Sequence, residues 1–426
     1  MPKDLLYKNR VIGQMPSSWA KVKIDQNLID ILGGFSCPKS RAIASGLPHF
    51  RPFNITTEGE VVYTPDTVHI PDDCQTGVDR YFLLEGDVLF NNTNSVELVG
   101  KTGIVRQPMQ VAFSNHINRL RVRNREQIDP KWLALFLRDL QSRGFFAANC
   151  NKWIGQAGFS VDSLSEVDIP LPDIGTQRQI VARIEALLSE VREMREINQN
   201  INRDSSQLLA AILKETFPDP QKQAPDQWIW EPLGNRCKTT SGGTPRRGIQ
   251  DYFNGSIPWI KSGELNDGVI IESEEKITQL AIERSNAKLF PVGTLLIAMY
   301  GATIGKLGIL GLEAATNQAV CAIFPPPEIL PEYLFWYLRR LRKELIYGSF
   351  GGAQPNISQT VIRKIQIPIP FYKDIEKSKT EQLRIVDYLK SISEEIVQIQ
   401  KLSIHDRNLI SQLEQSVLAQ AFRGEL

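Results

Sequence analysis

The sequence Gly100-Lys101-Thr102 suggests chemistry first, because it matches the last three residues of a phosphate-binding P-loop. It lies near the end of the stretch NNTNSVELVGKTGIV at residues 91–105. A P-loop also needs a glycine at position 95, where this chain has Ser95. The related sequence Gly305-Lys306 is followed by Leu307, which has no hydroxyl group to hold magnesium. The stretch therefore predicts a loop that contacts another ligand, and a P-loop NTPase is disfavoured.

The residue patterns of other catalytic classes are also missing from the sequence. An adenine methyltransferase needs an Asn/Asp-Pro-Pro-aromatic sequence for the extruded base, but Pro325–Pro327 is followed by Glu328. The charge run Glu274–Lys276 is the nearest approach to a nuclease cluster, and such runs are usually solvated surface. The four histidines and five cysteines are scattered, with no Cys-x-x-Cys pair. We therefore expect no catalytic residue, no metal site and no cofactor bound by this chain.

An internal duplication explains why the Gly-Lys sequence occurs twice. Eight pairs of similar segments follow one another in the same order, at separations of 198 to 210 residues. Examples are Pro16–Trp19 with Pro225–Trp228, Gly33–Gly34 with Gly242–Gly243, and Gln177 with Gln382. Each copy predicts a globular head followed by a long helix.

The heads are expected to be strand-rich. Short apolar runs such as GDVLF (86–90) and TLLIAMY (294–300) are separated by Gly, Pro and Asn, which is typical of strands and turns. One helix per head is expected at residues 130–144 and 331–345, each opened by proline. The predicted fold class is α+β, with two tandem pseudo-symmetric heads and two long helices. The expected boundaries are 1–172 for the first head, 173–220 for the central helical spacer, 221–372 for the second head and 373–426 for the distal helical spacer.

The two spacers carry the same hydrophobic repeat. Apolar residues recur at spacings of four and three in both copies, which predicts a coiled-coil seam. The expected seam residues are Ile180, Ile184, Leu187, Val191, Met194, Ile385, Leu389, Ile392, Ile396 and Ile399. The helices are expected to pack antiparallel because a whole head separates them; the alternative is that each packs only on its own head. Each would be roughly 55–60 Å long. Two heads on such a spacer suit a two-part linear target such as DNA, which repeats about every 34–36 Å.

Several segments carry a family resemblance that covers essentially the whole chain. They are TSGGTP (240–245), SIPWIKSGEL (256–265), GTLLIAMYGATIGKLGIL (293–310), TNQAV (316–320), LEQSVLAQAFRGEL (413–426), GLPHFRPFNI (46–55), NNTNSVELVGKTGIV (91–105) and PLPDIGTQRQIVARIE (170–185). Together they resemble the DNA specificity subunits of type I restriction–modification systems. The first head departs at Phe35-Ser36-Cys37, which replaces the Thr-Pro that follows the paired glycines, so the path of that loop is open.

The resemblance implies a role without catalysis. Each head would be a target recognition domain that reads one half of a bipartite, asymmetric site in double-stranded DNA. The helices would set the spacing of the half-sites and dock two modification subunits, which bind S-adenosylmethionine and methylate adenine. Restriction subunits that use ATP and Mg²⁺ would join the full complex. The alternative within this resemblance is a scaffold or anti-restriction protein that mimics such a subunit.

The residues expected to contact DNA are amides, hydroxyls and cations in the duplicated loops, because these groups read base edges and phosphates. In the first head they are Arg51, Asn54, Asn91, Asn92, Asn94, Lys101, Thr102, Asn115 and His116. In the second head they are Arg246, Arg247, Lys261, Tyr300, Thr303, Lys306, Asn317 and Gln318. An ordinary Asx-rich turn remains the alternative at residues 91–94. Glycines 100 and 305 are expected to make a tight turn or a close approach.

Composition fits this interpretation without deciding it. The formal net charge is +1, so any nucleic-acid footprint must be local. The first ten residues, MPKDLLYKNR, have no apolar signal-peptide core, and no apolar run of 18 residues occurs in the chain. The absence of these segments and the scattered cysteines favour a cytoplasmic protein without a membrane span.

Overall fold

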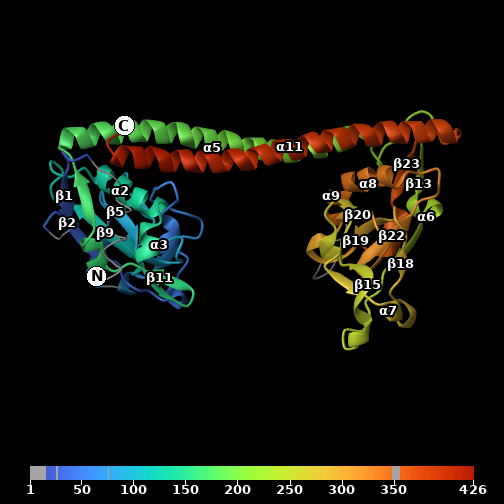
Figure 1. Ribbon diagram of the computed structural model, residues 1–426, viewed down its shortest axis with the longest axis horizontal. Coiled ribbons are helices and arrows are strands. Elements are labelled where there is room, and N and C mark those ends of the chain that lie inside the picture. Colours follow the sequence, from blue (N-terminus) through green and yellow to red (C-terminus); the bar gives the residue numbers. More distant parts are fainter. Residues whose placement is uncertain (1–15, 25–26, 75, 348–355) are drawn as a thin grey trace. The chain divides into compact units, whose positions relative to one another are not determined.

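The computed structural model describes residues 16–24, 27–74, 76–347 and 356–426. The first ten residues, whose sequence predicts no signal peptide, lie outside this range. The chain divides into two compact units. Unit 1 comprises Met1–Asn198 with His405–Leu426, and unit 2 comprises Gln199–Ile404. Each unit therefore contains one head and a part of both long helices (Figure 1).

The central sheet of each head has the same strand order, which confirms the duplication. In the first head the order is β2 (Ile29–Gly33), β9 (Ile117–Val122), β5 (Val88–Asn91) and β7 (Thr102–Ile104). In the second head it is β14 (Lys238–Ser241), β22 (Val320–Phe324), β19 (Leu295–Ala298), β20 (Leu307–Leu310) and a further strand, β16 (Gly268–Ile270). All neighbours are antiparallel except β16, which runs parallel to β20. In the first head a parallel bridge from Glu60 to Ile104 stands at the place of β16.

A smaller sheet in each head ends beside the expected reading loops. It consists of β4 (Val68–Ile70), β3 (Leu47–Phe50) and β8 (Ala112–Phe113) in the first head. In the second head it consists of β17 (Glu275–Ile277), β15 (Phe253–Ile260), β21 (Ala314–Thr316) and β18 (Leu289–Phe290). The pairs β3·β8 and β15·β21 are parallel, so each pair ends at the same edge of its sheet. This edge is where the chain continues into Asn115 and Asn317.

The expected head helices are present and face the core. The helix α2 (Pro130–Ser142) and its counterpart α8 (Pro331–Arg340) both begin at proline, as predicted. The second expected helix divides, because α9 (Arg342–Tyr347) follows α8 as a separate segment. Trp132 of α2 and Tyr333 of α8 are almost fully buried and hydrogen-bond to the carbonyls of Pro170 and Pro368.

Other elements complete the heads. Two-stranded ribbons, β1 (Ala20–Lys23) with β12 (Asp168–Leu171) and β13 (Ile229–Pro232) with β23 (Gln366–Ile369), precede the long helices. A small sheet in the first head contains β10 (Asn151–Trp153), β11 (Gln156–Gly158) and β6 (Thr93–Asn94). The short helices are α3 (Phe145–Asn149), α4 (Val161–Ser165), α6 (Leu233–Arg236), α7 (Gln279–Arg284) and α10 (Gln359–Lys364).

A buried glutamine fixes the start of each long helix to its head. The side-chain amide of Gln177 donates to the carbonyls of Gln127 and Pro172, and its oxygen accepts from the backbone N–H of Asp129. Gln382 makes the corresponding bonds to the Glu328 carbonyl and the Leu330 N–H. Because both amides are buried, losing these bonds would leave polar groups without partners. Each helix therefore leaves its head in a defined direction.

The long helices are α5 (Ile174–Thr216) and α11 (Ile375–Phe422), and they pack antiparallel, as predicted (Figure 1). In unit 1, Arg195 of α5 pairs with Glu414, near the end of α11. In unit 2, Asn202 of α5 donates a hydrogen bond to Ser403. The partner's number on α11 thus falls as the number on α5 rises. This order confirms the coiled-coil fold class.

The predicted seam is only partly correct. Six of its residues are buried: Ile180, Ile184, Val191, Ile385, Leu389 and Ile396. Leu187 and Ile392 are half-buried, whereas Met194 is 42% exposed and Ile399 is 40% exposed. On α5 the buried and half-buried column instead continues through Leu188, Arg195, Asn198, Asn202 and Ser205.

Polar seam residues explain this error. The corresponding column of α11 contains Ser393, Gln400 and Ser403 among apolar residues. A polar residue at a core position lowers stability but favours one register. Because these core positions are polar, the apolar repeat in the sequence points instead to the adjacent, exposed positions, which include Met194 and Ile399. The hydrogen bond between Asn202 and Ser403 is such a polar contact in the seam of unit 2.

The paired glycines and Gly100 have clear steric roles. A Cβ atom on Gly34 or Gly242 would lie 2.2 Å from the carbonyl oxygen of Ser114 or Thr316, so the backbones there approach closely. Gly100 has a φ of +85° and would meet Phe146, and Gly305 has a φ of +75°. The expected close approach and turn are thus both present. After Gly34 the chain continues in an isolated parallel bridge from Phe35 to Ser114, which settles the path of that loop.

Candidate nucleic-acid interface

Three loops of the second head meet at the edge where β15 and β21 end. The Gly243 N–H donates to the Thr316 carbonyl at 2.9 Å, and the Asn317 N–H donates to the Ile260 carbonyl at 3.0 Å. The Thr244 hydroxyl donates to the side-chain oxygen of Gln318. The structure therefore brings together Asn317, Gln318 and the chain that continues into Lys261. Gln318 is exposed and Asn317 is half-buried.

A turn between β19 and β20 joins the same edge. The Met299 N–H donates to the Ala319 carbonyl at 2.8 Å, which places Tyr300 beside the loop of Asn317 and Gln318. Tyr300 and Lys306 are exposed, and Thr303 is half-buried. The predicted residues of this turn thus share one surface with the other loops of the second head.

The cations Arg247 and Lys261 are paired rather than free. Arg247 forms a bidentate pair with Glu275 at 2.6 and 3.2 Å, while Lys261 lies 2.7 Å from Glu274 and 3.2 Å from Glu275. The guanidinium of Arg247 holds the pKa of Glu275 below its usual value, and Glu274 raises that of Lys261. The carboxylates of the run 274–276, interpreted from the sequence as plain solvated surface, therefore orient two candidate DNA contacts.

Arg247 is also stacked on aromatic rings. Its guanidinium carbon lies 5.0 Å from the ring centre of Phe253 and 5.2 Å from that of Trp259. Arg246 and Arg247 are both exposed, as expected, but the Arg247 guanidinium is held by Glu275 and the two rings. A fixed, planar guanidinium is the geometry that bidentate recognition of guanine or phosphate needs.

The first head gathers its candidates at the corresponding edge. The Asn92 side-chain amide donates to the Asn115 carbonyl at 3.1 Å and to the side-chain oxygen of Asn118 at 2.9 Å. The Asn92 N–H donates to the His116 carbonyl, and the Ser114 N–H donates to the Phe50 carbonyl immediately before Arg51. Asn115 is exposed, while Asn92, His116 and Arg51 are half-buried.

Three candidates in the first head are buried within the fold and are withdrawn as base contacts. Asn54 is fully buried and bonds to the Arg51 N–H, the Val62 carbonyl and Thr67. Asn91 is fully buried as the last residue of β5 and donates to the Leu98 carbonyl. The Thr102 hydroxyl is buried and donates to the Gly100 carbonyl. None of these side chains reaches the surface, and Asn91 is a strand residue rather than part of an Asx turn, because its side-chain oxygen accepts no hydrogen bond among the described residues.

The remaining candidates of the first head are partly accessible. Asn94 is half-buried, and its side-chain oxygen accepts from the Ser95 N–H. Lys101 is half-buried, and this burial lowers its pKa, whereas its duplicate Lys306 is exposed. Arg51 donates from Nη2 to the Cys37 carbonyl at 3.1 Å. The sulfur of Cys37 lies 2.6 Å from that of Cys74, so two of the cysteines that look scattered in the sequence are neighbours.

A hairpin that the sequence reading missed lies beside this surface. The strand β10 pairs with β11, and β11 pairs with β6, which contains Asn94. At the hairpin tip Trp153 is 60% exposed and Ile154 is fully exposed, and Lys152 precedes them. The signal was available, because Lys-Trp-Ile-Gly places two apolar residues directly before a turn glycine. A two-stranded ribbon is one of the elements that fit the major groove of DNA.

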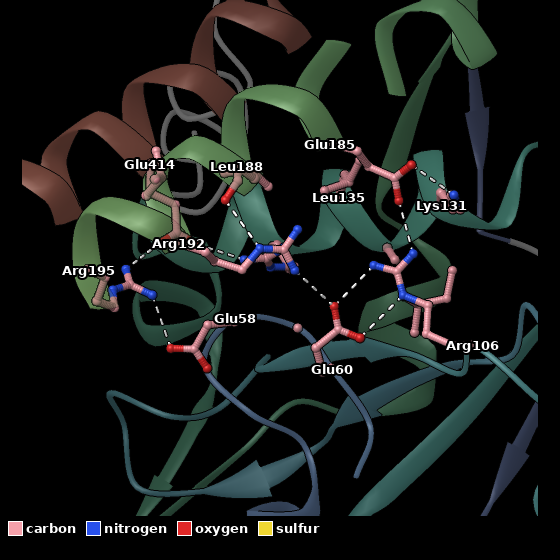
Figure 2. Close-up of a pocket in the computed structure, with 15 residues that line it drawn as sticks. Glu58, Glu60, Arg106, Lys131, Leu135, Glu185, Leu188, Arg192, Arg195 and Glu414 are labelled. Carbon is pink, nitrogen blue, oxygen red and sulfur yellow. Dashed lines mark hydrogen bonds and ion pairs between the residues drawn. The ribbon is translucent and has the colours of Figure 1, made fainter. Parts of the chain in front are cut away.

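Opposite charges attach the first head to its own part of the long helices. Figure 2 shows Glu60 between Arg106 and Arg192, and Glu58 beside Arg195. Arg106 also pairs with Glu185 of α5, which accepts from Lys131. Arg195 and the largely buried Arg138 both pair with Glu414 at 2.7 Å. This network, which we call the head–helix network, holds the loop around Gly59 on α5 and α11 within unit 1.

A buried carboxylate in α2 gives the first head a pH-dependent stability. Burial raises the pKa of Asp139 to about 6 although Arg143 pairs with it at 2.8 Å. The folded state therefore binds more protons than the unfolded state between pH 3.8, the usual pKa of an aspartate, and about 6. This contribution to stability is complete below pH 4 and is lost as the pH rises through 6.

We expect the free energy of unfolding of the native chain, relative to an Asp139→Asn variant, to fall by about 2–3 kcal/mol between pH 4 and pH 7. Urea titrations at each pH measure the difference. The control is Asp162→Asn, which removes an exposed carboxylate of the same unit. A difference between native chain and Asp139→Asn that stays constant with pH would contradict the burial argument.

Among the described residues, no three His, Cys, Asp or Glu side chains gather as a metal site. Within the same residues, none of the helices combines the length and apolar character that crossing a bilayer requires. The residues gathered at the two edges are thus amides, hydroxyls, aromatic rings and cations. Two copies of one head, each with such an edge, on paired helices define a duplicated recognition scaffold.

The comparisons with known proteins place this scaffold in a family. The family model described as "Type I restriction modification DNA specificity domain" matches residues 59–203 and 225–405, so it recurs in both halves. The chain therefore belongs to the type I restriction–modification DNA specificity family.

Individual relatives agree with this assignment. The chain is 22% identical over 424 residues to the putative type I restriction enzyme MjaX specificity subunit of Methanocaldococcus jannaschii, covering 96% of each chain. It is 26% identical over 276 residues to the EcoR124I/EcoR124II specificity subunit of Escherichia coli, covering 61% of this chain and 62% of that one.

Solved structures share the fold. A chain from a structural study of assembly in the type I restriction–modification system matches with a TM-score of 0.76 and 23% identity, over 97% of this chain and 99% of that one. The HsdS subunit from Thermoanaerobacter tengcongensis matches with a TM-score of 0.57 and 22% identity, over 97% and 98% of the two chains.

Proposed function

We propose that this chain is the DNA sequence-recognition subunit of a type I restriction–modification complex. Each head would read one half of a bipartite site in double-stranded DNA. The observation that carries this proposal is the matched pair of loop edges on a duplicated fold in a DNA specificity family. The family is one of specificity rather than catalysis, so the chain itself is not an enzyme.

The two edges have the same backbone layout but different side chains. Asn115 and Asn317 are the same at the two edges, but Asn92 and His116 occupy the first edge whereas Tyr300 and Gln318 occupy the second. Amides and cations of this kind read base edges and phosphates, and different side chains read different bases. The proposed site is therefore asymmetric. Exposed Arg246 and Lys306 suit phosphate contacts, and the fixed Arg247 suits a base or phosphate contact.

The long helices are proposed to dock two modification subunits. Exposed apolar side chains recur along both long helices: Met194, Ile197, Ile201, Leu208, Ile399, Leu402, Leu409 and Leu413. Exposed apolar residues that repeat on a helix are typical of a protein interface. Methylation with S-adenosylmethionine, and ATP- and Mg²⁺-dependent restriction, would belong to the partner subunits in the cytoplasm. This chain is proposed to bind none of these cofactors.

The test exchanges one head. Residues 225–370 are replaced by the corresponding residues of a related specificity subunit, and the complex with its methyltransferase partner is expressed in cells. Sequencing of methylated adenines is expected to show one half of the site changed and the other half retained. Methylation that is unchanged, or that changes in both halves, would contradict the assignment of one half-site to each head. A scaffold or anti-restriction protein would give no site-specific methylation at all.

A further inference from the structure

Unit 2 contains a groove lined by several cationic side chains. It lies between the C-terminal part of α5 and the segment Arg339–Glu344 of α8 and α9. The wall from α5 is mainly apolar and includes Leu209 and Leu213. The opposite wall carries Arg339, Arg340, Arg342 and Lys343, and Lys214 lies at the α5 side.

Arg340 is the unusual residue of this groove. Its side chain is only 6% exposed, yet its Nε and Nη1 groups make no hydrogen bond among the described residues. The Glu344 carboxylate lies 3.8 Å away and is itself 59% exposed. Buried N–H groups of a guanidinium that donate no hydrogen bond are costly, because their desolvation is not compensated. An acceptor supplied from outside would remove this cost.

The neighbouring arginines differ in their partners. Arg342 is bonded to Asp267 and to the Gly305 carbonyl. Arg339 lies over the ring of Trp336 at 5.2 Å, and its burial lowers its pKa. The groove thus contains two guanidinium groups that are weakly paired among the described residues: that of Arg339, which lies over an aromatic ring, and that of Arg340, whose carboxylate partner Glu344 is exposed and 3.8 Å away. Both lie on the side that faces α5.

The duplication shows which groups compensate these positions in the first head. A shift of 201 residues relates Arg339 to Arg138 and Arg340 to Asp139. Arg138 pairs with Glu414 of α11 at 2.7 Å, and Asp139 pairs with Arg143. A shift of 205 residues relates Glu414 to Leu209. The second head therefore has one more buried cation and one less helix-borne carboxylate than the first.

We propose that an acidic, amphipathic helix of a partner protein occupies this groove. Its carboxylates would pair with Arg340 and Arg339, and its apolar side would pack on Leu209, Ala210 and Ala211 of the α5 wall. A protein helix is favoured over a nucleic-acid phosphate for two reasons. The α5 wall is mainly apolar, and in unit 1 the carboxylate that pairs with Arg138, that of Glu414, is carried by the helix α11. The inference rests on the proposed function only in requiring a partner subunit. It also means that the two heads would bind their partner subunits through different contacts.

Labelling of lysines tests whether a partner covers the groove. The full chain, alone and assembled with its modification subunits, is acetylated and mapped by mass spectrometry. Lys343 and Lys214 are expected to become several-fold less reactive on assembly, and carbodiimide is expected to link them to Asp or Glu of one partner segment. Lys306, on the reading turn, is the control and should keep its reactivity until DNA is added.

Two results of this experiment would overturn the groove proposal. One is unchanged reactivity of Lys343 and Lys214 in a complex that still methylates its site, which leaves the proposed function intact. The other is protection by duplex DNA alone, which would assign the groove to a phosphate backbone. A complex that assembles and protects the lysines but shows no site-specific methylation would instead count against the proposed function.

A substitution in α5 gives an independent test. Leu209→Glu supplies the acid that the second head lacks, so the melting temperature of the isolated chain is expected to rise by about 2–4 °C. The same variant, and Arg340→Gln, should weaken assembly with the modification subunits. The matched control is Gln207→Glu, an exposed position of the same helix outside the groove. If Leu209→Glu lowers the melting temperature, or if it assembles as well as Gln207→Glu, the proposal is wrong.

Discussion

Replacing Glu414 by alanine is expected to lower the free energy of unfolding by about 3 kcal/mol. This carboxylate is the shared partner of Arg138 and Arg195 in the head–helix network. Arg138 is largely buried, so removal of Glu414 leaves a desolvated charge without its main partner. The loss should be larger than for an exposed ion pair, because water replaces an exposed partner at little cost.

Urea titration of the full chain measures this effect. Glu425→Ala is the control, since Glu425 forms an exposed pair with Arg423 in the same unit. Its expected effect is within about 0.5 kcal/mol. The double variant Arg138→Met, Glu414→Leu should recover part of the loss, because it removes the buried charge together with its partner. Equal stability of Glu414→Ala and Glu425→Ala would show that the network does not hold the head on the helices.

Replacing Gln318 by alanine is expected to relax recognition of one half-site, with a loss of discrimination of about 1–3 kcal/mol at one base pair. The side chain is exposed at the edge of the second head and is oriented by Thr244. Lys306→Gln should act differently. Its charge would contact phosphate, so affinity should fall for all sequences and the salt dependence should decrease by about one unit of slope.

Binding of the assembled complex to duplexes with single changes in each half-site separates the two variants. Lys401→Gln on α11 is the control, because it removes an exposed charge outside the heads. Uniform weakening by Gln318→Ala, or a changed base preference in Lys306→Gln, would reverse the roles assigned here to an amide and an ammonium group.

The architecture could be predicted because the sequence contains two copies of the same head and helix. Pairs such as Gln177 and Gln382 keep their order along the whole chain, and both make the same bonds in the structure. The turn at Gly100 was predictable for a local reason, because a glycine there tolerates a positive φ. The antiparallel arrangement of the helices followed from the length of the head between them.

Whether an individual polar side chain is buried or exposed, and which partner it has, could not be predicted. In NNTN, Asn91 ends a buried strand and Asn92 begins the surface loop, but the sequence contains four similar residues in a row. Arg247 looks like a free cation in the sequence, although its partner Glu275, at the start of β17, lies 28 residues further along the chain. The seam failed for a related reason, since Asn202 is a core residue only because its hydrogen-bond partner is present on α11. Each case depends on a neighbour that is distant in sequence.

The glutamine joints at the starts of α5 and α11 have an evolutionary consequence. Gln177 and Gln382 bind backbone carbonyl and N–H groups of their heads, and the Gln382 amide has one further bond to Ser378 of its own helix. Backbone groups are the same whatever side chains the reading loops carry. A gene that exchanged one head for a diverged copy would therefore keep the joint while acquiring new loops. Selection can then act on the DNA sequence that a head reads without altering the hydrogen bonds that attach the head to its long helix.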